Sequence, residues 1–206
     1  MIRSSLLIAS ASVALSGCAL LASPDPVQLY RFGGASAFAG TGATSACPDV
    51  HVSMRRVDFS EASRGDRILA VTGAEAAYIK GARWVSPAET LFEEALRNAF
   101  LDGGTCTVLS SGPLTRDGLL LSVDVRRFEA AYAAPGAVPD ANIVVLLRLI
   151  RPGDRSIVAE DRIAVSESAG ENRQSAIVAA FDRATAEASR QIVLWTDQQG
   201  FQATRN

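Results

Sequence analysis

The sequence predicts a two-layer α+β domain in which a mostly antiparallel sheet carries two amphipathic helices packed on one face. The chain has 206 residues, 48% apolar and 20% charged, which is the composition of a globular protein with a core of its own. Two stretches repeat apolar residues every three or four positions, as helices do, and most others alternate or are apolar throughout, as strands do. Turn formers separate the strands, so an antiparallel meander is expected.

Charge and hydropathy argue against two functional classes. The chain carries 20 basic and 22 acidic side chains, so no basic surface for nucleic acid is expected. The basic pairs Arg55-Arg56 and Arg126-Arg127 fall in strand-like segments, where solvated side chains are the simplest interpretation. Beyond the N-terminus, no stretch approaches the ~20 apolar residues that a membrane-spanning helix needs.

The first residues indicate a secretory signal with a lipidation site. Arg3 precedes the mostly apolar run Leu6–Leu15, as in a signal peptide. The run ends in Leu15-Ser16-Gly17-Cys18, which resembles the lipobox of bacterial lipoproteins: a branched residue, two small residues and a cysteine. The alternative is an ordinary signal peptide with an incidental cysteine.

The lipobox resemblance implies how the mature protein is attached. Residues 1–17 would be the lipoprotein signal peptide, and 18–26 the lipidated cysteine and tether. Several acyl chains (palmitate) on Cys18 would anchor the protein permanently, because each buried methylene contributes about 0.8 kcal/mol. Lipoproteins retained in the inner membrane commonly carry aspartate where this chain has Ala19. We therefore expect a lipid anchor in the outer membrane, with the domain facing the periplasm.

Two further cysteines would lie in the oxidising periplasm. Cys47 and Cys106 are the only pair left for an intramolecular disulfide once Cys18 is acylated. We predict this disulfide, with a stabilisation on the order of 2–4 kcal/mol. Two buried, reduced thiols are the alternative.

The domain, residues 27–201, begins and continues mainly with strands. Thr72-Gly73 should close a hairpin, and Ile143–Leu147, apolar on both faces, is predicted to be the central strand. The segment Ala131–Pro139, rich in alanine with two prolines, is predicted to project as a loop. The predicted strands are 27–32, 50–57, 66–71, 75–80, 105–110, 119–130, 142–151 and 156–166.

The first helix is predicted to begin at Ser86, whose side chain can accept from the first amides. Pro87 suits the first helical position, and Glu89 can bond back to Ser86 as in a capping box. The helix should end in a left-handed turn at Gly103-Gly104. We expect Trp84 to be a core anchor rather than a ligand contact. The apolar face comprises Leu91, Phe92, Ala95, Leu96, Ala99 and Phe100.

The second helix is predicted over Asn172–Gln199, with Asn172 as its cap. Its outer face should be charged, because four ionisable side chains fall largely opposite its apolar positions. The apolar positions are Ile177, Phe181, Ala184, Ala188, Ile192 and Trp195, and the charged ones Asp182, Arg183, Glu187 and Arg190.

Catalytic patterns are not found in the sequence. His51 is the only histidine, which excludes a multi-histidine metal site and leaves a Ser-His-Asp triad no other base. It lies on a predicted strand, where a surface role is the simplest interpretation. Within the loop 33–45, the run Gly40–Thr44 lacks the lysine of a phosphate-binding loop. We therefore expect no catalytic residue, no metal and no cofactor.

The order of these parts resembles the ABC-type transport auxiliary lipoproteins. The resemblance rests on the lipobox, the strand Leu29-Tyr30-Arg31-Phe32, the hairpin tyrosine Tyr78, and the helix start Arg83-Trp84-Val85-Ser86-Pro87. It covers nearly the whole mature chain, although the loop 33–46 is longer than expected for the family. The structural motif that it singles out comprises Tyr78, Arg83, Trp84, Ser86, Pro87 and Glu89.

The resemblance implies a function in transport. Members of the family serve transporters of the mammalian-cell-entry type, which handle phospholipids or other apolar molecules between the envelope membranes. The chain would be a non-enzymatic docking subunit for the periplasmic mammalian-cell-entry protein, held to membrane lipid through Cys18. Whether it forms a homo-oligomer is left open by the sequence. Two other hypotheses are a carrier that buries an acyl chain between helices and sheet, and a lipoprotein that assembles outer-membrane β-barrels.

Overall fold

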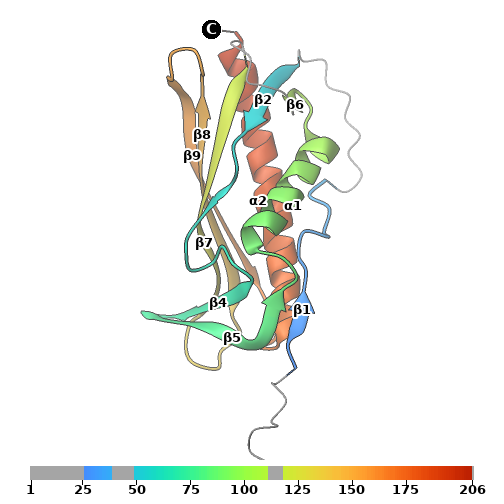
Figure 1. Ribbon diagram of the computed structural model, residues 1–206, viewed down its shortest axis with the longest axis vertical. Coiled ribbons are helices and arrows are strands. Elements are labelled where there is room, and N and C mark those ends of the chain that lie inside the picture. Colours follow the sequence, from blue (N-terminus) through green and yellow to red (C-terminus); the bar gives the residue numbers. More distant parts are fainter. Residues whose placement is uncertain (1–25, 39–48, 111–117, 206) are drawn as a thin grey trace, which may run out of the picture.

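The computed structural model describes residues 26–38, 49–110 and 118–205, and it confirms the α+β class. Within these residues, nine strands form one open sheet, and both helices lie on the same side of it (Figure 1). The elements in chain order are β1 (Gln28–Tyr30), β2 (Val50–Met54), β3 (Asp58–Phe59), β4 (Arg67–Thr72), β5 (Glu75–Trp84), α1 (Ala88–Gly103), β6 (Thr107–Leu109), β7 (Leu119–Tyr132), β8 (Asp140–Ile150), β9 (Ile157–Ser168) and α2 (Gln174–Ala203).

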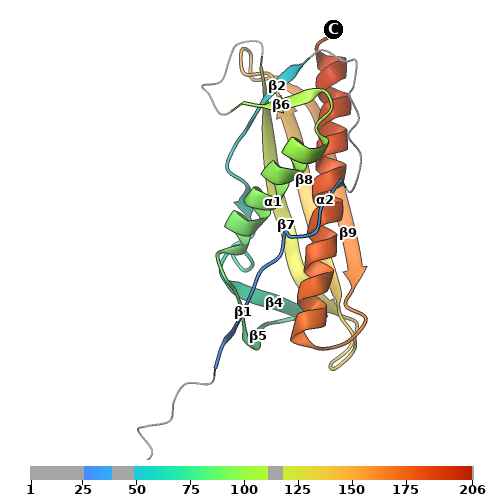
Figure 2. The same cartoon turned by 90° about the vertical axis from the view of Figure 1, so that its right-hand side faces the viewer.

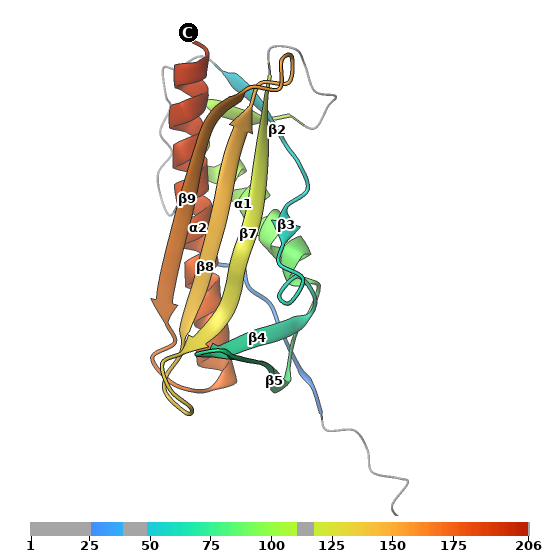
Figure 3. The same cartoon turned by 90° about the vertical axis from the view of Figure 1, so that its left-hand side faces the viewer.

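The strands β7, β8 and β9 form the predicted antiparallel meander. β8 pairs with β7 along nearly its whole length and with β9 on its other edge, so the apolar run Ile143–Leu147 lies in the middle strand of the meander. Within the whole sheet, β7 is the strand that pairs with the largest number of others, and β8 lies next to the edge strand β9. Figure 3 shows the three strands with the helices behind them. Side chains on the uncovered face include the ion pair Arg148–Glu160, with an N–O distance of 2.6 Å. The face away from the helices therefore carries charged side chains beside the apolar Val144 and Leu146.

The second edge of β7 is covered by three short strands in succession. β2, β3 and β4 all run parallel to β7, starting from the register pairs Val52↔Leu119, Asp58↔Asp124 and Ala70↔Ala130. The sequence indicated strands here but not their parallel pairing, because alternation shows that a segment is extended without naming its neighbour. The predicted strand 50–57 ends early, at Met54.

The predicted hairpin of β4 and β5 is present. Gly73 lies at its turn with a φ of +59°, a conformation that favours glycine. β5 continues beyond the predicted end to Trp84, because its second half pairs in parallel with β1. The first strand is correspondingly short, covering only Gln28–Tyr30 of the predicted 27–32.

The two helices contact the sheet differently. α2 packs directly against β8 and β9, and α1 lies beside α2 (Figure 2). α1 reaches the sheet through Phe92, whose ring centroid lies 5.6 Å from that of Phe59 and 6.3 Å from that of Phe128. Both helices therefore lie on one face of the sheet, as predicted; α2 packs directly on the strands, and α1 packs mainly on α2.

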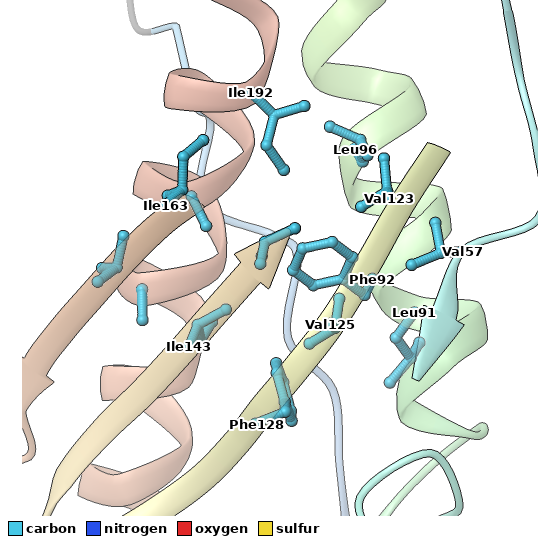
Figure 4. Packing of buried hydrophobic residues seen from close by; sticks show 14 of the residues in the cluster. Val57, Leu91, Phe92, Leu96, Val123, Val125, Phe128, Ile143, Ile163 and Ile192 are labelled. Atoms are coloured by element: carbon cyan, nitrogen blue, oxygen red, sulfur yellow. The ribbon is translucent and has the colours of Figure 1, made fainter. Parts of the chain in front are cut away.

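Aromatic rings fill the space between helices and sheet. The ring centroid of Trp84 lies 4.8 Å from that of Phe32 and 5.4 Å from that of Phe181. Phe181 in turn lies 4.7 Å from Phe128 of β7. Figure 4 shows Phe92 and Phe128 among aliphatic side chains from both layers. Trp84 is only 2% exposed, which confirms its prediction as a core anchor.

The predicted capping box of α1 is wrong. The N-cap residue is Pro87, and it makes no side-chain capping bond. The amides of Ala88 and Glu89 instead donate to the carbonyls of Gly65, at 2.9 Å, and Arg64, at 3.3 Å. The Glu89 carboxylate accepts a hydrogen bond from Arg56 at 2.5 Å. Because the backbone of a distant loop satisfies these amides, Ser86 is not needed as a cap.

α1 ends at Gly103 as predicted, but without the predicted left-handed turn, and both ends of α2 differ from prediction. Gly104, with φ −65° and ψ 116°, is extended, and Gly103 does not have positive φ either. Gly103 is required by close packing, because an added Cβ would lie 2.2 Å from the Phe38 ring. The cap of α2 is Arg173; Asn172 instead accepts from the Tyr132 hydroxyl at 3.2 Å. α2 also extends past its predicted end, to Ala203.

Candidate functional site

The predicted structural motif forms a joint between the β4–β5 hairpin, the loop 60–66 and α1. The Tyr78 hydroxyl donates to the Ala62 carbonyl at 3.0 Å, and the Arg83 guanidinium donates to the Asp66 carboxylate at 2.8 Å. The backbone amide of Trp84 donates to the Asp66 carbonyl at 2.7 Å. These bonds fix the loop whose last carbonyls cap α1. The motif therefore helps to set the position of α1, and its Glu89 additionally accepts a hydrogen bond from Arg56.

A stacked arginine reinforces this joint. The guanidinium carbon of Arg67 lies 3.7 Å from the ring centroid of Tyr78, within range of a cation–π interaction. Pro87 and Ser86 occupy the turn that leads into α1, and neither makes a side-chain capping bond to it.

Asp182, on α2, holds the segment after β1. One carboxylate oxygen accepts the amides of three consecutive residues: Gly33 at 2.7 Å, Gly34 at 2.9 Å and Ala35 at 3.2 Å. Gly33 has a φ of +84°, and an added Cβ would lie 2.9 Å from the Cβ of Ala95. Glycine is therefore required at position 33 for the backbone conformation in which three consecutive amides bind one carboxylate oxygen.

Asp197, near the end of α2, holds the segment after α1 in the same way. Its carboxylate accepts the amides of Thr105 and Thr107, both at 2.8 Å, and that of Cys106 at 3.3 Å. The Thr105 hydroxyl adds a bond of 2.8 Å. Asp197 is only 6% exposed, so these donors replace the water that its charge would otherwise bind.

Sequence reasoning missed both carboxylates. It placed Asp182 on a solvated helix face and did not single out Asp197. The one signal was their spacing, because residues about four helical turns apart lie near the same face of α2.

Together the two aspartates position the segments that precede Cys47 and include Cys106. Cys106 is disulfide-bonded. Cys47 lies outside the described residues, so its pairing with Cys106 stays a prediction.

An open, charged groove runs along the outer face of α1. It encloses about 550 Å³, and its charges pair within it: Arg97 donates to Glu93 at 2.9 and 3.1 Å, and Arg56 bonds Glu89. Its lining side chains are charged or carry a hydroxyl, so it is not the apolar cavity that an acyl chain needs. The lining residues are Arg56, Glu89, Thr90, Glu93, Glu94 and Arg97.

The remaining sequence predictions concern His51, metal binding and membrane attachment, and some of them fall outside the described residues. His51 is an exposed residue of β2. Within the part of the chain that the structure describes, no three histidine, cysteine or acidic residues are grouped to hold a metal ion. Among its helices, none is both long and apolar enough to span a bilayer. The signal peptide, Cys18 and the run Gly40–Thr44 are not among the described residues.

The comparison with known families identifies the chain. Residues 35–193, about three quarters of the chain, match the ABC-type transport auxiliary lipoprotein component family. The chain belongs to this family. Membership indicates a membrane-anchored lipoprotein of the periplasm that assists an ABC-type transporter, in a family that is not a known enzyme family.

Solved structures share the fold. A protein from Xanthomonas campestris is 24% identical with a TM-score of 0.75, and the match covers 87% of this chain and all of that one. An uncharacterized protein is 16% identical with a TM-score of 0.62, covering 82% of this chain and 98% of its own. None of the curated proteins matches the chain significantly. At these identities the likeness extends to the fold alone.

Proposed function

We propose that this protein is the outer-membrane-anchored docking subunit of a mammalian-cell-entry-type ABC transport system for phospholipids or other apolar substrates. The observation that carries the proposal is family membership over residues 35–193, combined with a lipobox that ends at Cys18. The subunit would bind the periplasmic mammalian-cell-entry protein and hold it near the outer membrane. Ala19, in place of the aspartate of inner-membrane lipoproteins, supports the outer membrane as the site of attachment.

A non-enzymatic role is consistent with how the acidic side chains are used. Asp182 and Asp197 accept backbone amides, and Glu93 pairs with Arg97, so these carboxylates are engaged in holding segments together. Acid–base catalysis needs a carboxylate or histidine aimed into a concave site. The charged groove along α1 instead presents carboxylates already paired with arginines.

The core disfavours the alternative of a lipid carrier. A carrier needs apolar space for an acyl chain between the helices and the sheet. That space holds Trp84, Phe128 and Phe181, with neighbouring ring centroids 4.7 to 6.3 Å apart, which is ordinary contact for aromatic side chains. Organic extraction of the purified protein should therefore yield no stoichiometric lipid by mass spectrometry. A bound lipid at one per chain would favour the carrier.

The direct test of docking uses the Cys18→Ser protein, which lacks the acyl anchor and can be handled in solution. We expect it to bind the periplasmic domain of the mammalian-cell-entry protein from its own transport system. The matched control is the mammalian-cell-entry protein of an unrelated system, which should not bind. Absence of binding to the first protein at high concentration, with the variant folded by circular dichroism, would reject the docking role.

Localisation is tested by changing the residue after the lipidated cysteine. The wild-type protein should fractionate with the outer membrane, and Ala19→Asp should shift it to the inner membrane. Ala19→Ser serves as a control that changes the same position without an acidic group. Recovery of wild type with the inner membrane would contradict the outer-membrane assignment while leaving the docking experiment unaffected.

A further inference from the structure

One end of the domain, which we call the anchor end, combines three features. β1, which directly follows the tether, lies there, as do the β4–β5 turn and the loop 133–139 between β7 and β8 (Figures 1 and 3). The loop 151–156 between β8 and β9 lies at the opposite end. The two loops belong to the same three-stranded meander, so they can be compared directly.

The loop 133–139 is apolar throughout and largely exposed. Its sequence is Ala-Ala-Pro-Gly-Ala-Val-Pro, without a charged or hydrogen-bonding side chain. Val138 is 45% exposed, and 133–136 are exposed as well. Loops on a water-facing surface are normally polar, because they carry turn-forming polar residues and exposed backbone groups. An apolar loop of this length is therefore a feature that solvent exposure alone does not explain.

Hydrogen bonds hold this loop in one shape. The Ala137 amide donates to the Ala134 carbonyl at 3.1 Å, closing a turn in which Gly136 has a φ of +80°. From the segment before α2, the Asn172 side chain donates to the Gly136 carbonyl at 3.2 Å, and the Ala169 amide donates to Pro139 at 3.0 Å. The apolar surface is thus presented by a pre-organised loop.

The loop at the opposite end has the reverse character. Residues 151–156 read Arg-Pro-Gly-Asp-Arg-Ser, with three charged side chains. Asp154 accepts both the amide and the hydroxyl of Ser156, at 3.0 and 2.7 Å. The same meander therefore has an apolar loop at the anchor end and a charged loop at the other.

Further exposed apolar side chains lie beside the tether. Val27 and Leu29 are 48% and 55% exposed, and Val85, whose amide donates to the Tyr30 carbonyl at 2.7 Å, is 52% exposed. Residues 18–26 can span at most roughly 30 Å when fully extended. The 30 residues of α2 alone extend over about 45 Å. A bilayer holding Cys18 is thus always within reach of the anchor end.

We propose that the anchor end rests on the phospholipid bilayer, with the loop 133–139 and the exposed side chains of Val27 and Leu29 in its interfacial layer. The proposal rests on the lipid anchor at Cys18 that the proposed function assumes. Apolar surface removed from water is the driving force, and the tether supplies a high local lipid concentration. The charged end of the meander then points away from the membrane, toward the periplasmic partner.

Two tryptophan variants test this orientation. Val138→Trp places a reporter in the apolar loop, and Ile157→Trp places one at the opposite end, where Ile157 is 55% exposed in the wild type. Both acylated proteins are reconstituted on phosphatidylglycerol–phosphatidylethanolamine vesicles with and without brominated acyl chains. We expect brominated lipid to quench the added fluorescence of Val138→Trp and shift its emission to shorter wavelength, and to leave Ile157→Trp unchanged. Trp84 and Trp195 contribute the same background to both.

Each other outcome overturns the proposal in a recognisable way. Equal quenching of the two reporters would mean that the domain has no fixed orientation on the bilayer. Quenching of neither would mean that the loop stays in water. A shifted Val138→Trp emission in the Cys18→Ser background without vesicles would mean that a second copy of the chain covers the loop. None of these results bears on partner docking, which is measured without lipid.

Discussion

At the scale of single residues, two aspartates carry more structure than their position on a surface helix suggests. A carboxylate offers about four lone-pair sites on two oxygens. Asp197 uses both oxygens for the donors of residues 105–107, whereas Asp182 uses one oxygen for three amides. Because Asp197 is nearly inaccessible to water, the buried amide of Thr107 would have no ready replacement for this carboxylate if it were removed.

Asp197→Ala should therefore destabilise the domain more than Asp182→Ala. We expect a loss of about 2–4 kcal/mol in the free energy of unfolding for Asp197→Ala, since one buried and two partly buried amides lose their partner. For the more accessible Asp182 the loss should be about 1–2 kcal/mol, because water can replace part of the interaction. Urea denaturation of the Cys18→Ser background measures both. Equal losses would contradict the difference in burial as the cause.

The predicted disulfide gives a residue-scale test with an internal control. If Cys47 and Cys106 are paired, Cys47→Ser and Cys106→Ser should each reduce stability by about 2–4 kcal/mol, and the double variant by no more than either single one. Alkylation without reductant should leave the mass of the mature protein unchanged. Additive losses in the double variant, or two alkylated thiols in the wild type, would reject the Cys47–Cys106 bond.

At the scale of elements, the start of α1 is determined by a part of the chain about twenty residues earlier. The carbonyls of Arg64 and Gly65 occupy the place that a capping side chain takes in most helices. Tyr78 and Arg83 hold that loop through Ala62 and Asp66. The joint therefore couples the β4–β5 hairpin to α1. Removing a hydrogen bond between the hairpin and the loop 60–66 should also weaken the capping of α1.

Two substitutions separate this joint from an ordinary helix cap. Ser86→Ala should change the free energy of unfolding by less than about 0.5 kcal/mol, whereas removing a true N-cap serine typically costs ~1 kcal/mol. Tyr78→Phe removes only the hydroxyl that binds Ala62 and should cost about 1 kcal/mol. Thermal or urea unfolding checks both. If Ser86→Ala lowered the free energy of unfolding more than Tyr78→Phe, Ser86 would be an N-cap after all, as the sequence predicted.

The elements themselves were predictable where a pattern is local. Repeats of apolar residues located both helices, and the Thr72-Gly73 turn located the β4–β5 hairpin. The parallel pairing of β2, β3 and β4 with β7 was not predictable, because β3 has only two residues and its partner lies over sixty residues away. The cap at Gly65 and the amides bound by Asp197 were missed for the same reason: each depends on a partner that only the fold brings close.

At the scale of the whole molecule, the two ends of the β7–β9 meander carry loops of different character. The anchor end presents an apolar loop and the exposed side chains of β1, and the opposite end presents the charged loop 151–156. In the proposed orientation, a short tether and the apolar loop would act together, because the tether would keep the weakly binding loop near lipid. The periplasmic partner would then meet the end that is far from the bilayer.

Tether length should consequently control how firmly the anchor end is seated. A Gly/Ser insertion after Pro26 that doubles the length of segment 18–26 should lower the effective lipid concentration at the loop by up to about threefold, because this concentration falls roughly as the −3/2 power of linker length. Quenching of Val138→Trp by brominated lipid should fall accordingly. The total amount of vesicle-bound protein should not change, since the acyl chains hold it. Quenching that is independent of tether length would mean that the loop binds lipid without help from the anchor.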